Sequence, residues 1–201
     1  KRMLACSSIA QMGYIMLAFA FGMGLSGQGT DLGFIGGLYH ILGHVFMKGG
    51  AFLCAGAILY ALGTRDLDEM KGIGRALPLV GIPYTLCVLA LNGMPPMTGF
   101  VSEIFICRAG IDAGGPGILF VFIMLANIVI SLGYYIPSIN AIMFSKGKGP
   151  VFPGIRPVPL LMQATILIAT LLVLLLGIFP QAGLGIVSPA AAYLSHLFRP
   201  V

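Results

Sequence analysis

Apolar residues run in long blocks along this chain, separated by short stretches rich in glycine, proline or charge. A membrane-spanning helix needs about 20 mostly apolar residues. Five blocks are long enough: 3–23, 34–62, 77–107, 118–144 and 159–179. The tail, 180–201, is only moderately apolar and is expected to lie at the membrane interface. The pattern predicts an all-α integral membrane protein with five transmembrane helices and a single membrane domain over residues 1–201.

The third block contains the sequence NGMPPMTG, which cannot continue a regular helix. Each proline removes a backbone donor and clashes with the preceding turn. We therefore predict a break near Gly93–Thr98, shaped by Gly93, Pro95, Pro96 and Gly99. A broken backbone at membrane depth is tolerated only where it is buried in protein or lines a wet cavity, and transporters build ion sites at such breaks. An ordinary proline kink is the alternative.

Composition agrees with a lipid surrounding. The chain is 58% hydrophobic and only 8% charged, with mean hydropathy +1.02, whereas a soluble globular protein carries roughly 25% charged residues. The net charge of +5 is too scattered for a surface that follows nucleic-acid phosphates. The cysteines are isolated in apolar surroundings and are interpreted as small buried residues, so no metal site is predicted. They are Cys6, Cys54, Cys87 and Cys107.

Basic residues are distributed unevenly between the two sides of the predicted bundle. One side holds Lys1, Arg2, Arg65, Lys71, Arg75, Lys146, Lys148 and Arg156, and the other holds Arg108 and Arg199. Positively charged loops face the cytoplasm. The bias predicts a multi-pass protein of the cell (inner) membrane, with the Lys1 end cytoplasmic and the C-terminus on the outer side.

Three ionisable residues, His40, His44 and Lys48, follow one another at four-residue intervals in the second block. This spacing places them on one helix face, about 5–6 Å apart. Histidine gains and loses protons near neutrality, and burial makes a lysine easier to deprotonate. Because each group is costly inside a membrane, the face is interpreted as a proton relay. The alternative is a core histidine beside a lysine that reaches to the surface.

Glu103, just after the predicted break, is the acidic residue placed well within a block. A carboxylate at this depth is costly unless it is paired or hydrated, so it indicates function. Lys48 is the expected partner, or His44 through water.

Other polar residues carry weaker indications. Asn127, Ser131, Tyr134 and Tyr135 in the fourth block could hydrate a channel, with hydrogen bonding between helices as an equal alternative. Ser7, Ser8, Gln11 and Tyr14 in the first block are given less weight. His196 in the tail is expected to lie at the interface and take no part.

Three motifs in order resemble one family of membrane proteins. KRMLACSSIAQMGY is similar to a segment of the antiporter-like subunits of respiratory complex I, Mrp-type cation/proton antiporters and membrane-bound energy-converting hydrogenases. YHILGHVFMKGGAFLCAGAIL resembles the family's helix with two histidines and a lysine at four-residue intervals. LNGMPPMTGFVSEIFI resembles its broken helix with a central lysine or glutamate. The resemblance covers about residues 1–110.

The resemblance implies a fold of fourteen transmembrane helices containing two inverted five-helix repeats, each with one broken helix. It places this chain at the tenth to fourteenth helices, the C-terminal part of that fold. It matches His40, His44 and Lys48 to a relay on the eleventh helix, and Glu103 to the key ionisable residue of the twelfth. The first repeat is absent from this chain, so we expect another chain or segment to supply the preceding helices, together with other membrane subunits of a complex.

Two positions depart from the family pattern. Cys6 stands where a tyrosine is usual, and Tyr134-Tyr135-Ile136-Pro137 lacks an expected basic residue. The resemblance implies translocation of protons, or alternatively sodium, within a redox-driven complex such as an energy-converting hydrogenase or a complex I-type dehydrogenase. No cofactor is expected in this chain. The alternatives are part of a Mrp-type antiporter, half of a secondary transporter that pairs with another chain, and a non-pumping structural subunit.

Overall fold

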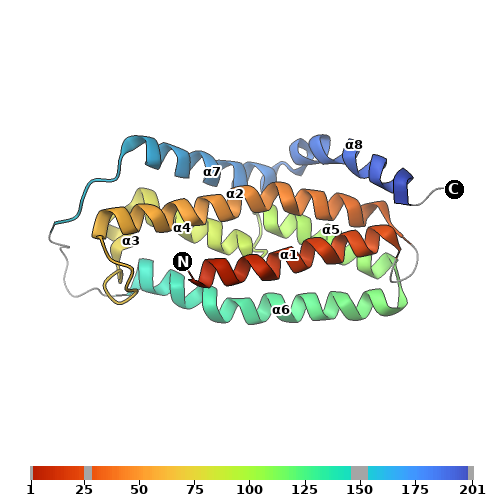
Figure 1. Ribbon diagram of the computed structural model, residues 1–201, viewed down its shortest axis with the longest axis horizontal. Coiled ribbons are helices and arrows are strands. Elements are labelled where there is room, and N and C mark those ends of the chain that lie inside the picture. Colours follow the sequence, from red (N-terminus) through yellow and green to blue (C-terminus); the bar gives the residue numbers. More distant parts are fainter. Residues whose placement is uncertain (1, 25–28, 146–153, 199–201) are drawn as a thin grey trace.

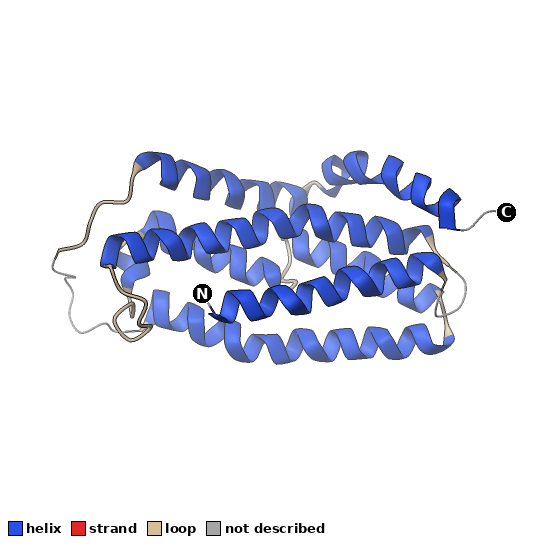
Figure 2. Ribbon diagram, in the orientation of Figure 1, coloured by secondary structure: helices blue, strands red, loops and turns tan. Residues whose placement is uncertain are grey.

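The computed structural model describes residues 2–24, 29–145 and 154–198, and the regular structure in these ranges is helical throughout (Figure 1, Figure 2). The elements are α1 (Arg2–Met23), α2 (Asp31–Leu62), α3 (Ile73–Ala76), α4 (Pro78–Leu91), α5 (Thr98–Asp112), α6 (Gly115–Ile139), the π-helix η1 (Asn140–Phe144), α7 (Leu160–Ile178) and α8 (Pro180–Phe198).

Four helical segments in the described ranges are long and apolar enough to cross a membrane: Met3–Met23, Asp31–Leu62, Gly115–Phe144 and Leu160–Ile178. They coincide closely with the first, second, fourth and fifth predicted blocks. The second begins at Asp31 rather than at residue 34, and a carboxylate in the first helical turn is stabilised by the helix dipole. The third predicted block forms two shorter helices, α4 and α5.

The longest helix, α2, lies at the centre of the bundle, with α1, α4, α5, α7 and α8 packed around it (Figure 1). Its glycines allow this close packing. A side chain at Gly43 or Gly50 would collide with Thr98 or Cys87, and one at Gly36 would make an unusually tight contact with Ile106. These glycines are seven residues apart and form the face of α2 that contacts α4 and α5. Small residues at helix contacts are typical of membrane bundles because they let the backbones approach.

The break in the third block lies between Leu91, where α4 ends, and Thr98, where α5 begins. It is therefore within one residue of the position predicted from the two prolines. The Asn92 and Gly93 N–H groups bond to the carbonyls of Leu89 and Ala90, each at 3.1 Å, and close the end of α4. Gly93 has φ of +68°, a left-handed conformation that favours glycine. The two half-helices lie end to end beside α2 (Figure 1).

The tail forms a helix, α8, which continues the line of α7 along the bundle (Figure 1). It packs against the first half of α2: Gly183 lies against Tyr39, Ser195 Oγ donates to Asp31 Oδ1 at 2.6 Å, and the Phe34 ring stacks on Phe198. The interfacial location expected for this tail stays a prediction. Residues 199–201 lie outside the described residues.

The basic loops gather at one end of the bundle. The connection after α2, α3 and residues 154–159, which lead into α7, lie at this end (Figure 1). The Arg75 guanidinium donates to the carbonyls of Met143 and Phe144 at 3.0 and 2.8 Å, and the Arg156 N–H bonds to Ala61 at 3.1 Å. Lys1, Lys146, Lys148 and Arg199 lie outside the described residues, as does the side chain of Arg2.

Candidate functional site

A set of polar side chains is buried inside the apolar bundle. Most of these residues come from α1, α2, α5 and the break, and the others from α6 and α7. The full set is Ser7, Gln11, His40, Lys48, Asn92, Thr98, Ser102, Glu103, Ser131, Ser138 and Thr170. Buried polar groups in a membrane protein are expensive unless they bond to one another or to backbone. Their concentration around the broken helix marks the candidate site.

His40 joins α1, α2 and the broken helix. Its side chain is fully buried. The ring nitrogen Nε2 lies 2.8 Å from Gln11 Oε1, and Nδ1 lies 2.9 Å from Ser102 Oγ. Gln11 in turn donates from Nε2 to the Leu91 carbonyl at 3.0 Å. Leu91 is the last residue of α4, and Ser102 lies near the start of α5. One imidazole is therefore linked to both halves of the broken helix.

His44 and Lys48 follow His40 along the same face of α2. The rings of His40 and His44 are 6.0 Å apart and inclined by 23°. His44 is half-buried, and its Nδ1 has no hydrogen-bond partner among the described residues. Lys48 is 6% exposed and donates to the Leu4 carbonyl at 3.0 Å and to Ser7 Oγ. On the predicted face of α2, His40 and Lys48 are therefore buried against protein, whereas His44 is partly exposed.

Glu103 lies in α5 and is 6% exposed. Its carboxyl group packs against Gly93 in the break. Together with Gly93 and Arg108 it lines an open cavity of about 430 Å³ between α5 and α6. Arg108 forms an ion pair with Asp112, with Nε 3.0 Å from Oδ1, at the end of α5.

The expected direct pairing of Glu103 with Lys48 is not formed. Among the residues that the structure describes, no ion pair joins the two, and Oε1 of Glu103 has no hydrogen-bond partner. Lys48 bonds instead to α1, because the start of that helix places a carbonyl and a hydroxyl within its reach. A link between Glu103 and Lys48 or His44 through water stays a prediction.

The break residues bring the two half-helices close together. A Cβ at Gly99 would collide with the carbonyl of Ala90, so a glycine at this position lets the first turn of α5 touch the last turn of α4. Pro95 and Pro96, joined by a cis peptide bond, lie in the connection.

The polar residues of α6 form hydrogen bonds between helices. Asn127 donates to Tyr14 Oη on α1 at 2.8 Å, and Ser131 donates to Asn92 Oδ1 in the break. Tyr135 is buried and its ring lies 4.5 Å from that of Tyr134. For Asn127 and Ser131 the bonding between helices is therefore observed, and hydration of a channel stays a prediction.

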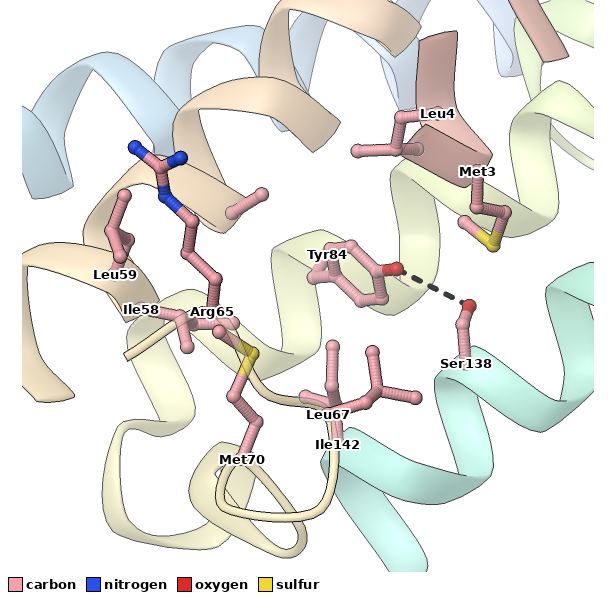
Figure 3. Close-up of a pocket in the computed structure, with 11 residues that line it drawn as sticks. Met3, Leu4, Ile58, Leu59, Arg65, Leu67, Met70, Tyr84, Ser138 and Ile142 are labelled. Carbon is pink, nitrogen blue, oxygen red and sulfur yellow. Dashed lines mark hydrogen bonds between the residues drawn. The ribbon is translucent and has the colours of Figure 1, made fainter. Parts of the chain in front are cut away.

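A second cavity lies at the basic end of the bundle (Figure 3). It has a volume of about 320 Å³ and is lined mostly by apolar side chains from α1, α2, α4 and the loop after α2. The Tyr84 hydroxyl donates to Ser138 Oγ at 3.2 Å in its wall. Leu4, whose carbonyl accepts a hydrogen bond from Lys48, also lines it. The cavity and the surroundings of Lys48 therefore share Leu4, although Lys48 itself does not line the cavity.

Sequence reasoning undervalued the contribution of α1. Ser7 and Gln11 supply partners to Lys48 and His40, although their prediction as site residues was weak. A signal for them was present: residues 7, 11 and 14 recur at helical spacing on one face of an otherwise apolar helix. Ser102 could not be singled out in the same way, because a lone serine beside Glu103 has no pattern of its own.

These observations define a class of protein: an all-helical membrane protein with a buried polar network at a broken helix. Residues 1–131 match the family described as NADH:quinone oxidoreductase/Mrp antiporter, transmembrane. The chain belongs to this family of multi-pass membrane proteins, and the resemblance inferred from its three motifs is confirmed.

Several relatives match over most of the chain. It is 34% identical to F(420)H(2) dehydrogenase subunit N of Methanosarcina mazei, covering 96% of this chain and 39% of that protein. It resembles a chain of respiratory complex I from Thermus thermophilus with a TM-score of 0.66 at 30% identity, covering 90% and 38% of the two chains. A chain of the Mrp complex from Dietzia sp. shares the fold, with a TM-score of 0.83 at 22% identity over 98% and 42%. The chain spans about two-fifths of the length of these proteins.

Proposed function

We propose that this chain translocates protons as an antiporter-like subunit of a redox-driven membrane complex. The observation that carries the proposal is the hydrogen-bonded set in which His40 links Gln11, Ser102 and both halves of a broken helix. Two of its relatives, a dehydrogenase subunit and a chain of respiratory complex I, support the redox-driven class.

The residues of α2 would pass charge along the bundle. Lys48 and Glu103 do not pair, so the charge of one is not cancelled by direct contact with the other. His44 and His40 follow Lys48 along α2, and His40 reaches Ser102, the residue before Glu103. Protonation of imidazole nitrogens is the chemistry that this arrangement offers. It favours a proton over sodium, which prefers a shell of oxygen ligands.

Two cavities provide access from opposite ends of this path. The cavity in Figure 3 is lined by Leu4, whose carbonyl accepts a hydrogen bond from Lys48, and the cavity beside Arg108 is lined by Glu103. Because basic loops face the cytoplasm, we place the Figure 3 cavity on the cytoplasmic side of the cell membrane and the C-terminus on the outer side.

The longer protein would follow the family arrangement. We infer that the chain supplies the tenth to fourteenth helices of a fourteen-helix fold, counting α4 with α5 as one broken helix. Another chain or segment would supply the preceding helices, and other membrane subunits would complete the complex. Its coverage of about two-fifths of the relatives' length supports this inference.

Glu103→Gln in the full-length subunit of the assembled, reconstituted complex tests the proposal. Glutamine keeps the shape but cannot release a proton, so we expect normal assembly and proton translocation reduced by tenfold or more. Glu103→Asp should retain part of the activity. The matched control is Glu69→Gln, the same change in an exposed loop. Proton movement at the normal rate in Glu103→Gln would refute the role of Glu103, and loss of assembly would favour a structural role.

A further inference from the structure

The two hydrogen bonds of Gln11 determine where its amide hydrogens lie. A carbonyl oxygen only accepts, so the atom of Gln11 that faces Leu91 O at 3.0 Å must be its NH₂ group. The reverse orientation would place two oxygens against each other. The amide oxygen therefore faces His40 Nε2 at 2.8 Å, and it too can only accept. Nε2 of His40 must carry a hydrogen.

This leaves Nδ1 as the nitrogen of His40 that gains and loses a proton. It lies 2.9 Å from Ser102 Oγ, and the same hydroxyl oxygen lies 2.8 Å from the Gly99 carbonyl. A serine has one hydroxyl hydrogen and two lone pairs. When His40 is neutral, Ser102 donates to Nδ1. When His40 is charged, Nδ1–H donates to Ser102, which turns its hydrogen to the Gly99 carbonyl. Both protonation states are fully hydrogen-bonded.

We propose that Gln11 is a positioning residue that holds a proton on Nε2 of His40, and that the Ser102 hydroxyl accommodates the change of protonation at Nδ1 by turning its hydrogen. Gln11, His40 and Ser102 are 3%, 0% and 1% exposed, so water does not replace either partner. The Leu91 carbonyl is available for this purpose because α4 ends there. The break in the helix thereby fixes the tautomer of a histidine on another helix.

Two ionisable side chains have rings close to His40, one on its own helix and one on α1. The His44 ring lies 6.0 Å away and the Tyr14 ring 6.1 Å away, in an edge contact. Neither side chain forms a hydrogen bond with His40, because Gln11 and Ser102 occupy its two ring nitrogens. The tautomer is thus set by Gln11. The consequence for transport rests on the proposed function.

Infrared spectroscopy of the assembled complex tests the position of the proton, because the two neutral histidine tautomers have different ring vibrations. The His40 band is assigned by its loss in His40→Gln. We expect Nε2–H in the wild type and a mixture of tautomers in Gln11→Met, or in the milder Gln11→Asn if the first variant does not assemble. Ser102→Ala should keep Nε2–H. Ser8→Ala is the matched control on α1, since within the described ranges its hydroxyl bonds only to the Leu4 carbonyl, at 3.2 Å.

Proton translocation is measured on the same preparations. We expect it to fall about tenfold in both Gln11→Met and Ser102→Ala and to stay unchanged in Ser8→Ala. An Nδ1–H band in the wild type, or an unchanged band in Gln11→Met, would overturn the proposal. The proposed function fails separately: if His40→Gln moves protons at the wild-type rate while Gln11→Met still changes the tautomer, the positioning role of Gln11 stands and the relay does not.

Discussion

Glu103 and Gly93 form one structural unit at the break in the membrane helix. A methyl group placed on Gly93 would lie only 2.7 Å from the carboxyl carbon of Glu103, well inside van der Waals contact. The same glycine has φ of +68° and helps to end α4. The break therefore does more than bend the helix, since it makes the space in which the buried carboxyl group lies. An ordinary proline kink would not account for this contact.

Gly93→Ala should displace the Glu103 carboxyl group and reduce proton translocation about tenfold. The methyl group cannot be accommodated without moving the acid, and the left-handed backbone adds roughly 1–2 kcal/mol of strain. The measurement is proton translocation per electron transferred in the reconstituted complex, together with the thermal stability of the complex. Retention of full translocation would show that the acid does not need this position.

Gly63→Ala is the matched control for that variant. Gly63 ends α2 with φ of +72°, but a Cβ there would meet nothing within 4 Å. It carries the same backbone strain without the collision. We expect both variants to lose stability, Gly93→Ala by more because of the collision, and only Gly93→Ala to lose translocation. Equal losses of translocation would assign the effect to strain alone.

The positions of the spans and of the break could be predicted from local sequence, whereas the hydrogen-bond partners of the predicted relay residues could not. Apolar blocks and Pro95-Pro96 specify spans and a break, because lipid and proline act on the chain directly. Lys48, by contrast, was expected to pair with Glu103 and bonds instead to Leu4 and Ser7. These partners are more than 40 residues away in the chain. Packing between helices decides which groups meet, and no periodicity encodes it.

The two α1 groups bonded to Lys48 suggest a sharp test of the lysine. Ser7→Ala removes one acceptor of the ammonium group of Lys48, a residue that is 6% exposed, and leaves the Leu4 carbonyl. We expect proton translocation to fall about tenfold or more, because the charged form of Lys48 loses a hydrogen bond worth about 1.5–3 kcal/mol. Lys48→Met should abolish translocation while the complex still assembles.

Ser8→Ala is the control for Ser7→Ala. Both serines bond to the Leu4 carbonyl within α1, at 3.0 and 3.2 Å, but Ser8 has no hydrogen bond to Lys48. Its removal should leave translocation unchanged. If the two serine variants behave alike, the contact between Ser7 and Lys48 has no part in transport.

A second interruption in the bundle lies between α7 and α8. Tyr39 precedes His40 on α2, and its hydroxyl donates to the Leu176 carbonyl at 2.5 Å, near the end of α7. Tyr39→Phe leaves that buried carbonyl without its donor, which should cost about 1–2 kcal/mol. We expect a lower unfolding temperature of the complex with proton translocation per electron unchanged, because the bond holds α7 rather than a group of the relay. Tyr60→Phe, the same change at a 45% exposed position of α2, is the control and should change neither. A loss of translocation in Tyr39→Phe at unchanged stability would instead make the junction of α7 and α8 part of the proton path.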